Sequence, residues 1–165
     1  MPLSVTETHM TRKHIAGLLH DVADPEIPIV SIVDLGMVLD IKPVGNEWQI
    51  DLAPTYSGCP AIDVIPMLVQ LRLEEAGYHN IKAGMIISPP WSTEWISESG
   101  KEKLSAYGIA PPNRKDFIEG EDKPKQCPQC GSVDTVMISR FSSTPCKAAY
   151  RCTACQEPFE YFKCY

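Results

Sequence analysis

The spacing of the cysteines constrains this 165-residue chain more than any other feature of its sequence. Six of the seven cysteines lie between Cys127 and Cys164. Two Cys-x-x-Cys pairs, with 21 residues between them, are formed by Cys127, Cys130, Cys152 and Cys155. Each pair can place two thiolates on one tight turn, and a hairpin between the pairs can bring all four around a tetrahedral ion. We therefore predict a β-rich zinc ribbon over residues 127–165.

The zinc ion has a structural role in this interpretation. The ribbon contains little apolar material, so a bound ion is expected to supply the stability that a core would otherwise give. A thiol oxidoreductase is the alternative, but two pairs at ribbon spacing favour a metal over a redox pair. Cys146 and Cys164 stay outside the quartet. They could be buried thiols, an alternative ligand, or a second soft-metal site together with Cys59.

Residues 1–108 have the pattern of a small α/β domain. Apolar residues three and four apart predict an amphipathic helix over 11–22, and two extended segments around a turn at 43–46 predict a hairpin. The expected order is a helix over 11–22, an ordered loop over 24–34, strands over 37–41 and 48–52, a helix over 61–76, a strand over 81–88, and a helix from Ser92 or Thr93 to 104–107. This order predicts an α+β fold, a two-layer domain with its helices on one face of the sheet.

Pro66 leaves two starting points open for the helix over 61–76. A helix capped by Asp63 would have Pro66 in its first turn, where the missing N–H costs nothing. A helix that begins at Pro60 would be kinked at Pro66 instead.

The distribution of charge argues against a nucleic-acid partner. Residues 1–110 carry 7 basic and 14 acidic side chains, and residues 127–165 carry 4 basic and 3 acidic ones. Binding to a phosphate backbone needs a basic face, which neither part offers. Residues 109–126 are rich in proline and in charges of both signs, so we predict an interdomain linker there.

The start of the chain resembles neither a secretory signal nor a membrane anchor. It lacks a basic region followed by an apolar one, and no apolar run in the chain is long enough to cross a bilayer. We therefore expect a cytoplasmic protein without a membrane partner, in which thiols stay reduced and paired cysteines bind metal.

Cys59 is isolated from the other cysteines and lies between a predicted strand and a predicted helix. The N-terminus of a helix presents unpaired N–H groups and the positive end of the helix dipole, so the thiol is expected to tend toward thiolate. A small buried side chain with a purely structural role is the other interpretation of this position.

Three short segments of the chain resemble the metal–sulfur cluster biosynthesis domain family. They are Asp24-Pro-Glu-Ile-Pro, Val33-Asp-Leu-Gly-Met-Val, and Thr55 with Gly58-Cys59-Pro60. Further segments, among them Ser88-Pro-Pro-Trp-Ser-Thr-Glu-Trp and Phe141-Ser-Ser-Thr-Pro-Cys-Lys, resemble the PaaD family, the D subunits of bacterial phenylacetyl-CoA epoxidase complexes. That family fuses this domain to a cysteine ribbon.

The resemblance implies a role beside an enzyme of phenylacetate catabolism. It implies a non-catalytic accessory subunit of a di-iron monooxygenase system, which helps to assemble or maintain an iron or iron–sulfur centre. Cys59 is then the candidate transient ligand, with Asp24, Glu26 and Thr55 in the same loop region. The partners would be other subunits of the complex, the oxygenase or the reductase, and a homodimer is possible. A purely structural or docking subunit without metal transfer is the alternative.

Overall fold

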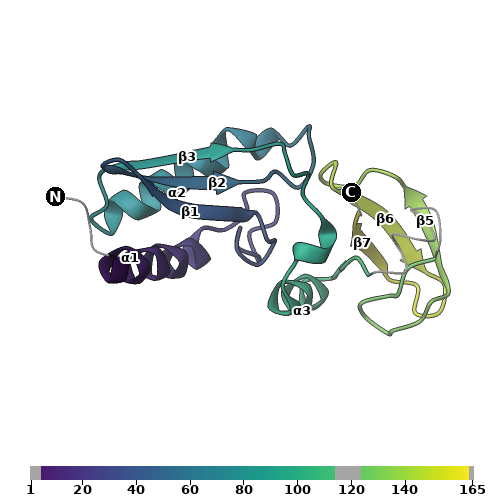
Figure 1. Ribbon diagram of the computed structural model, residues 1–165. Coiled ribbons are helices and arrows are strands. Elements are labelled where there is room, and N and C mark those ends of the chain that lie inside the picture. The colour runs from purple at the N-terminus through teal and green to yellow at the C-terminus, as the bar shows by residue number, and fades with distance from the viewer. Residues whose placement is uncertain (1–4, 114–123, 164–165) are drawn as a thin grey trace. The chain divides into compact units, whose positions relative to one another are not determined.

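The computed structural model describes residues 5–113 and 124–163, and the chain divides into two compact units (Figure 1). We call Met1–Trp91 the N-terminal unit and Ser92–Tyr165 the ribbon unit. The division falls earlier in the sequence than the boundary predicted at residue 108. Most of the predicted linker, residues 114–123, lies outside the described residues.

The N-terminal unit contains one three-stranded sheet and two helices (Figure 1). Its elements are α1 (Val5–Leu18), β1 (Val38–Val44), β2 (Glu47–Leu52), α2 (Val64–Glu75) and β3 (Ile81–Met85). The sheet order is β1-β2-β3, with β1 antiparallel and β3 parallel to β2, so α2 is the crossover of a β-α-β unit. Because α1 contacts β1, α2 contacts β3, and the helices contact each other, they form one layer on one face of the sheet. The predicted two-layer domain is confirmed.

The two faces of this sheet differ in polarity, as the alternation along a strand requires. Ile41, Ile50 and Ala83 are register partners on the helix-covered face, where Ile50 is fully buried. The opposite face is polar: the Lys42 ammonium donates a hydrogen bond to the Asp51 carboxylate, which also accepts one from the Gln49 side chain. The hydrophobic core of the unit therefore lies between the sheet and the helices.

The structure settles where the second helix begins. Asp63 directly precedes α2, and Pro66 falls in the first helical turn, so the helix needs no kink. A separate 3₁₀ turn, Pro60–Ile62, comes before it. Gly77, with φ of +92°, follows the last turn and supplies the left-handed conformation that ends the helix.

The last predicted helix is wrong in its boundary, because two caps divide the segment. Ser92 caps only a 3₁₀ turn over Thr93–Trp95, and α3 (Glu98–Ala106) begins after Ser97, whose hydroxyl accepts a hydrogen bond from the Gly100 N–H at 2.9 Å. The first helix also differs from its prediction, since α1 begins at Val5 and gives way to a 3₁₀ turn after Leu18.

The ribbon unit contains α3 and a four-stranded sheet in the order β4-β7-β6-β5 (Figure 1). The strands are β4 (Ile109–Ala110), β5 (Thr135–Ser139), β6 (Lys147–Cys152) and β7 (Pro158–Phe162). β4 pairs with β7, so the start of the predicted linker belongs to the sheet. Tyr150, Phe159 and Tyr161 form the core together with Cys127 and Cys152. Among the described residues, no helix is both long and apolar enough to span a bilayer.

Candidate functional site: a cysteine quartet and a buried thiol

The first Cys-x-x-Cys pair lies on a tight turn between residues 127 and 132. The Cys127 N–H donates to the Ser132 carbonyl at 2.9 Å, and the Gly131 N–H donates to the Cys127 carbonyl at 2.9 Å. Gly131 has φ of +75°, a conformation that glycine adopts without strain. The turn thus points both sulfurs of the pair to one side.

The second pair repeats this turn at the end of β6. The Cys152 N–H donates to the Glu157 carbonyl at 3.0 Å, five residues ahead, as Cys127 does in the first turn. Gln156 occupies the position equivalent to Gly131 and has φ of +67°, the one positive φ among the described non-glycine residues. A left-handed residue therefore follows the second cysteine of each pair.

The four sulfurs converge on one point. The Sγ of Cys127 lies 3.8 Å from that of Cys155, the Sγ of Cys130 lies 3.6 Å from that of Cys152, and all four sulfurs lie within 4.8 Å of one another. With zinc–sulfur bonds of about 2.3 Å, tetrahedral geometry separates neighbouring sulfurs by about 3.8 Å. The quartet therefore has the dimensions of a closed four-thiolate metal site.

The pKa values of two thiols in the quartet are shifted in opposite directions. Backbone N–H groups, first that of Cys155 and then that of Ala154, lower the pKa of the Cys152 thiol to about 7 despite partial desolvation. The Glu157 N–H acts in the same sense on Cys155, but desolvation and the sulfurs of Cys130 and Cys152 raise its pKa to about 12. Thiols at this distance cannot all ionise without a cation between them.

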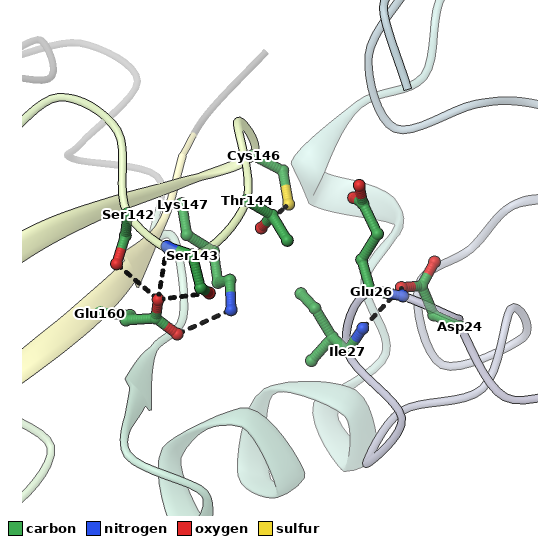
Figure 2. Close-up of polar contacts among 9 residues, drawn as sticks. All are labelled: Asp24, Glu26, Ile27, Ser142, Ser143, Thr144, Cys146, Lys147 and Glu160. Atoms are coloured by element: carbon green, nitrogen blue, oxygen red, sulfur yellow. Dashed lines mark hydrogen bonds and ion pairs between the residues drawn. The ribbon is translucent and has the colours of Figure 1, made fainter. Parts of the chain in front are cut away.

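Glu160 of β7 holds the loop between β5 and β6 in place (Figure 2). Its carboxylate accepts hydrogen bonds from the hydroxyls of Ser142 and Ser143 and from the Lys147 ammonium, the last two at 2.7 Å. Partial burial raises the pKa of Glu160, but the bonds from Lys147, Ser142 and Ser143 outweigh it and lower the pKa to about 2. This cluster was not predicted from the sequence, although lysine and glutamate on adjacent strands were a usable signal.

Cys146 is not part of the quartet. The Cys146 side chain is buried in the ribbon unit, and its sulfur lies 3.0 Å from the Thr144 hydroxyl (Figure 2). Cys164 lies outside the described residues. A second soft-metal site that includes these two thiols stays a prediction.

In the N-terminal unit, Cys59 lies at the end of the loop between β2 and α2. Its N–H donates to the Tyr56 carbonyl at 3.3 Å, and its own carbonyl accepts the Ile62 N–H at 3.1 Å. The side chain is 4% exposed. The loop therefore fixes the backbone of Cys59 on both sides and keeps the thiol from bulk water.

The expected thiolate character of Cys59 is wrong. Burial, followed by the negative charges of Glu26 and Asp24, raises the pKa of the thiol, although a backbone bond from Ala61 and a side-chain bond from Tyr56 partly oppose this. The helix that starts at Pro60 is only a three-residue 3₁₀ turn, so it provides little of the dipole that we assumed. Burial and the neighbouring carboxylates therefore favour the protonated form of the Cys59 thiol.

The other candidate residues lie in buried or half-buried loops. Asp24 is 5% exposed, and its Oδ1 accepts hydrogen bonds from the N–H groups of Glu26 and Ile27, both at 2.8 Å (Figure 2). Thr55 is 6% exposed. The loop around Asp24 and the Cys59 loop are close enough for electrostatic coupling, but in the described ranges only the quartet groups three or more ligand atoms at metal-binding distance.

Two family models match separate parts of the chain, one that contains Cys59 and one that contains the cysteine quartet. Residues 12–76 match the family described as "Iron-sulfur cluster assembly protein", and residues 111–163 match the "PaaD zinc beta ribbon domain". Fold and site thus define a class of protein in which an iron–sulfur cluster assembly domain is joined to a zinc β-ribbon.

A curated relative narrows the class. The chain is 41% identical over 150 residues, 91% of each chain, to a protein of Escherichia coli (strain K12) that is named "Putative 1,2-phenylacetyl-CoA epoxidase" and specified as its D subunit. The chain belongs to this family, the D subunits of phenylacetyl-CoA epoxidases.

A solved structure agrees with the fold of the first domain. A domain of unknown function, DUF59, from Bacillus anthracis superposes with a TM-score of 0.57 at 29% sequence identity. The match covers 61% of this chain and 97% of that one, so the Bacillus protein corresponds to part of this chain.

Proposed function

We propose that this chain is a non-catalytic accessory subunit of the phenylacetyl-CoA ring-epoxidase system, which assists the assembly or maintenance of an iron or iron–sulfur centre in a partner subunit. One observation carries the proposal. A domain of the iron–sulfur cluster assembly family, with a shielded thiol beside two carboxylates, occurs in a chain of the epoxidase D-subunit family. The client is the oxygenase or the reductase of the system.

Cys59 is the transient ligand in this proposal, and iron or a cluster is its cargo. The negative field of Glu26 and Asp24, which disfavours a thiolate, favours a cation that reaches the same place. When a cation binds, the thiol loses its proton and becomes a ligand. Asp24 organises its loop through hydrogen bonds to the N–H groups of Glu26 and Ile27, and Thr55 is a buried residue of the loop that leads to Cys59.

The quartet of Cys127, Cys130, Cys152 and Cys155 holds a structural zinc ion. Its sulfur spacing fits the ion, and four protein ligands leave no open position for a substrate. When bound, zinc links the two turns and thereby stabilises the small sheet. Neither turn then takes part in cargo transfer.

A docking role without metal transfer is the second candidate function. The observation in its favour is that Cys59 is a buried thiol with a raised pKa, as a structural cysteine would be. In that case the whole chain would matter for assembly of the complex, while the thiol would not.

The two candidates differ in the effect of Cys59→Ala. We expect this variant to fold and to lower the iron content of co-produced epoxidase or reductase several-fold, as measured by elemental analysis of the purified client. Cys146→Ala, which removes another buried thiol, is the matched control and should leave client iron unchanged. Normal client iron with Cys59→Ala, together with poor complex formation when the chain is omitted, would support the docking role instead.

A further inference from the structure

One face of α2 exposes apolar side chains that no described residue of the N-terminal unit covers. Val64, Met67 and Leu71 are 37%, 59% and 52% exposed. Their spacing of three and four residues puts them on one stripe of the helix. The opposite stripe, which packs toward the sheet, carries the fully buried residues Ile65, Val69 and Leu73. The helix is thus apolar on both sides, although only one side has a packing partner among the described residues.

A hollow of about 260 Å³ adjoins this stripe. It is lined by the apolar residues Val22, Leu68 and Leu71 and by the polar residues Asp21, Arg72 and Glu75. A protein usually exposes single apolar residues, whereas an apolar stripe beside a hollow of mixed polarity is typical of a docking site.

The charge around the stripe is negative. Asp63 precedes it, and Glu74 and Glu75 follow it in the last turn, all three exposed. The Arg72 guanidinium is engaged by the Asp21 carboxylate at 2.7 Å, so it does not offset the glutamates. The C-terminal end of α2 adds the negative end of its dipole at the same place.

We infer that this face of α2 binds an amphipathic helix of a partner subunit, with Leu- or Met-like side chains on one side and lysine or arginine beside them. The apolar side chains would cover Met67 and Leu71, and the basic ones would face Glu74 and Glu75. A second copy of this chain fits less well, because two such faces would bring acidic residues together. The inference goes beyond the proposed function and holds whether or not Cys59 handles iron.

Single exposed substitutions test the stripe without disturbing the core. Met67→Glu and Leu71→Glu should each weaken binding to one of the separately purified epoxidase subunits at least tenfold, measured by titration calorimetry. Val44→Glu makes the same change at a residue that is 49% exposed on the hairpin, and it should leave affinity unchanged. Cys59→Ala should also bind normally, which separates a failure of this inference from a failure of the proposed function.

The contribution of Glu74 and Glu75 to partner binding can be tested separately. Glu74→Lys combined with Glu75→Lys should weaken binding several-fold at low salt, and the difference from the unaltered chain should shrink at about 0.5 M salt, where the Debye length is only a few ångströms. Hydrogen exchange on the bound subunit should protect a segment with apolar and basic residues at helical spacing. Unchanged affinity of the Met67 and Leu71 variants, no binding to any subunit, or protection of an acidic segment would overturn the inference. So would a homodimer in light scattering that Met67→Glu dissociates.

Discussion

The cysteines of the two units lie in different surroundings. In the N-terminal unit, aliphatic side chains such as Ile50, Leu52 and Ile65 are fully buried and form a core of their own. In the ribbon unit the core is small and includes the cysteines Cys127 and Cys152. Thiols therefore make up a large share of the small ribbon core, whereas Cys59 is one thiol beside a larger aliphatic core in the first unit. This comparison separates cysteines that hold the fold from the one proposed to do chemistry.

Removal of a quartet ligand should produce the largest effect. Cys152→Ser should abolish zinc binding and unfold the ribbon sheet, since structural zinc supplies on the order of 10 kcal/mol of folding free energy in small modules. Amide resonances of β5–β7 should collapse in NMR spectra, while those of β1–β3 persist. Cys146→Ser is the control, and it should keep one zinc per chain. A folded ribbon without metal would contradict the distinction between the units.

Truncation of a core residue in the N-terminal unit should destabilise that unit and leave zinc binding by the ribbon unchanged. Ile50→Ala leaves a cavity beneath the helices and should lower the free energy of unfolding of the N-terminal unit by about 3 kcal/mol, with no change in zinc content. Denaturant titration measures the first quantity and elemental analysis the second. Ile138→Ala, at a residue 61% exposed on β5, should cost less than about 0.5 kcal/mol. Loss of zinc in Ile50→Ala would mean that the units are not independent.

The hydrogen bonds of Glu160 should make an intermediate contribution to the free energy of unfolding of the ribbon. Because the pKa of Glu160 is lowered to about 2 in the folded state, its bonds stabilise the fold above about pH 4.5 and are lost as the pH falls toward 2. Glu160→Gln should lower ribbon stability by about 1–2 kcal/mol at pH 7, less than the pKa shift alone suggests, because the site is partly exposed to solvent.

The difference in stability between Glu160→Gln and the unaltered chain should become smaller at low pH. Comparison with the unaltered chain at each pH, by thermal unfolding, cancels the acid release of metal that both proteins share. Glu157→Gln makes the same change at an exposed position and should have little effect. A deficit that stays constant below about pH 4.5 would show that the carboxylate charge is not what stabilises the loop.

The smallest changes in stability are expected from substitutions at the left-handed residues of the two cysteine turns, Gly131 and Gln156. Gly131→Ala forces a side chain into a left-handed conformation and should destabilise the ribbon by about 1 kcal/mol. Gln156→Gly relieves the same strain in the second turn but also removes the hydrogen bond that the Gln156 side chain donates to the Thr153 carbonyl, so stability should change by less than about 0.5 kcal/mol. Thermal unfolding of the zinc-loaded proteins measures both. A loss in Gln156→Gly as large as that in Gly131→Ala would contradict the equivalence of the turns.

The sequence predicted those features of the fold and the site that depend on neighbouring residues or on a fixed residue spacing. The hairpin of β1 and β2, the stop at Gly77 and the convergence of the four ribbon cysteines all follow from residues close to one another or at a fixed spacing. The α+β class followed from the order of these elements.

Features that depend on distant residues were not predictable in this way. The raised pKa of Cys59 arises from burial and from the charges of Glu26 and Asp24. The β1–β2 hairpin separates these two residues from Cys59 in the sequence. The assignment of α3 to the ribbon unit depends on pairing between β4 and β7, strands separated by most of the ribbon. Propensity and spacing report neither burial nor long-range pairing.

Cys59 is proposed to handle metal cargo, while the quartet is proposed to hold zinc. The most direct test is elemental analysis and visible absorption of anaerobically purified chain and of its Cys59→Ala variant, before and after exposure to ferrous iron and sulfide. We predict one zinc per chain in both proteins, and iron with iron–sulfur absorption only where Cys59 is present. Identical iron content and identical spectra for the two proteins would contradict a role of Cys59 in binding iron.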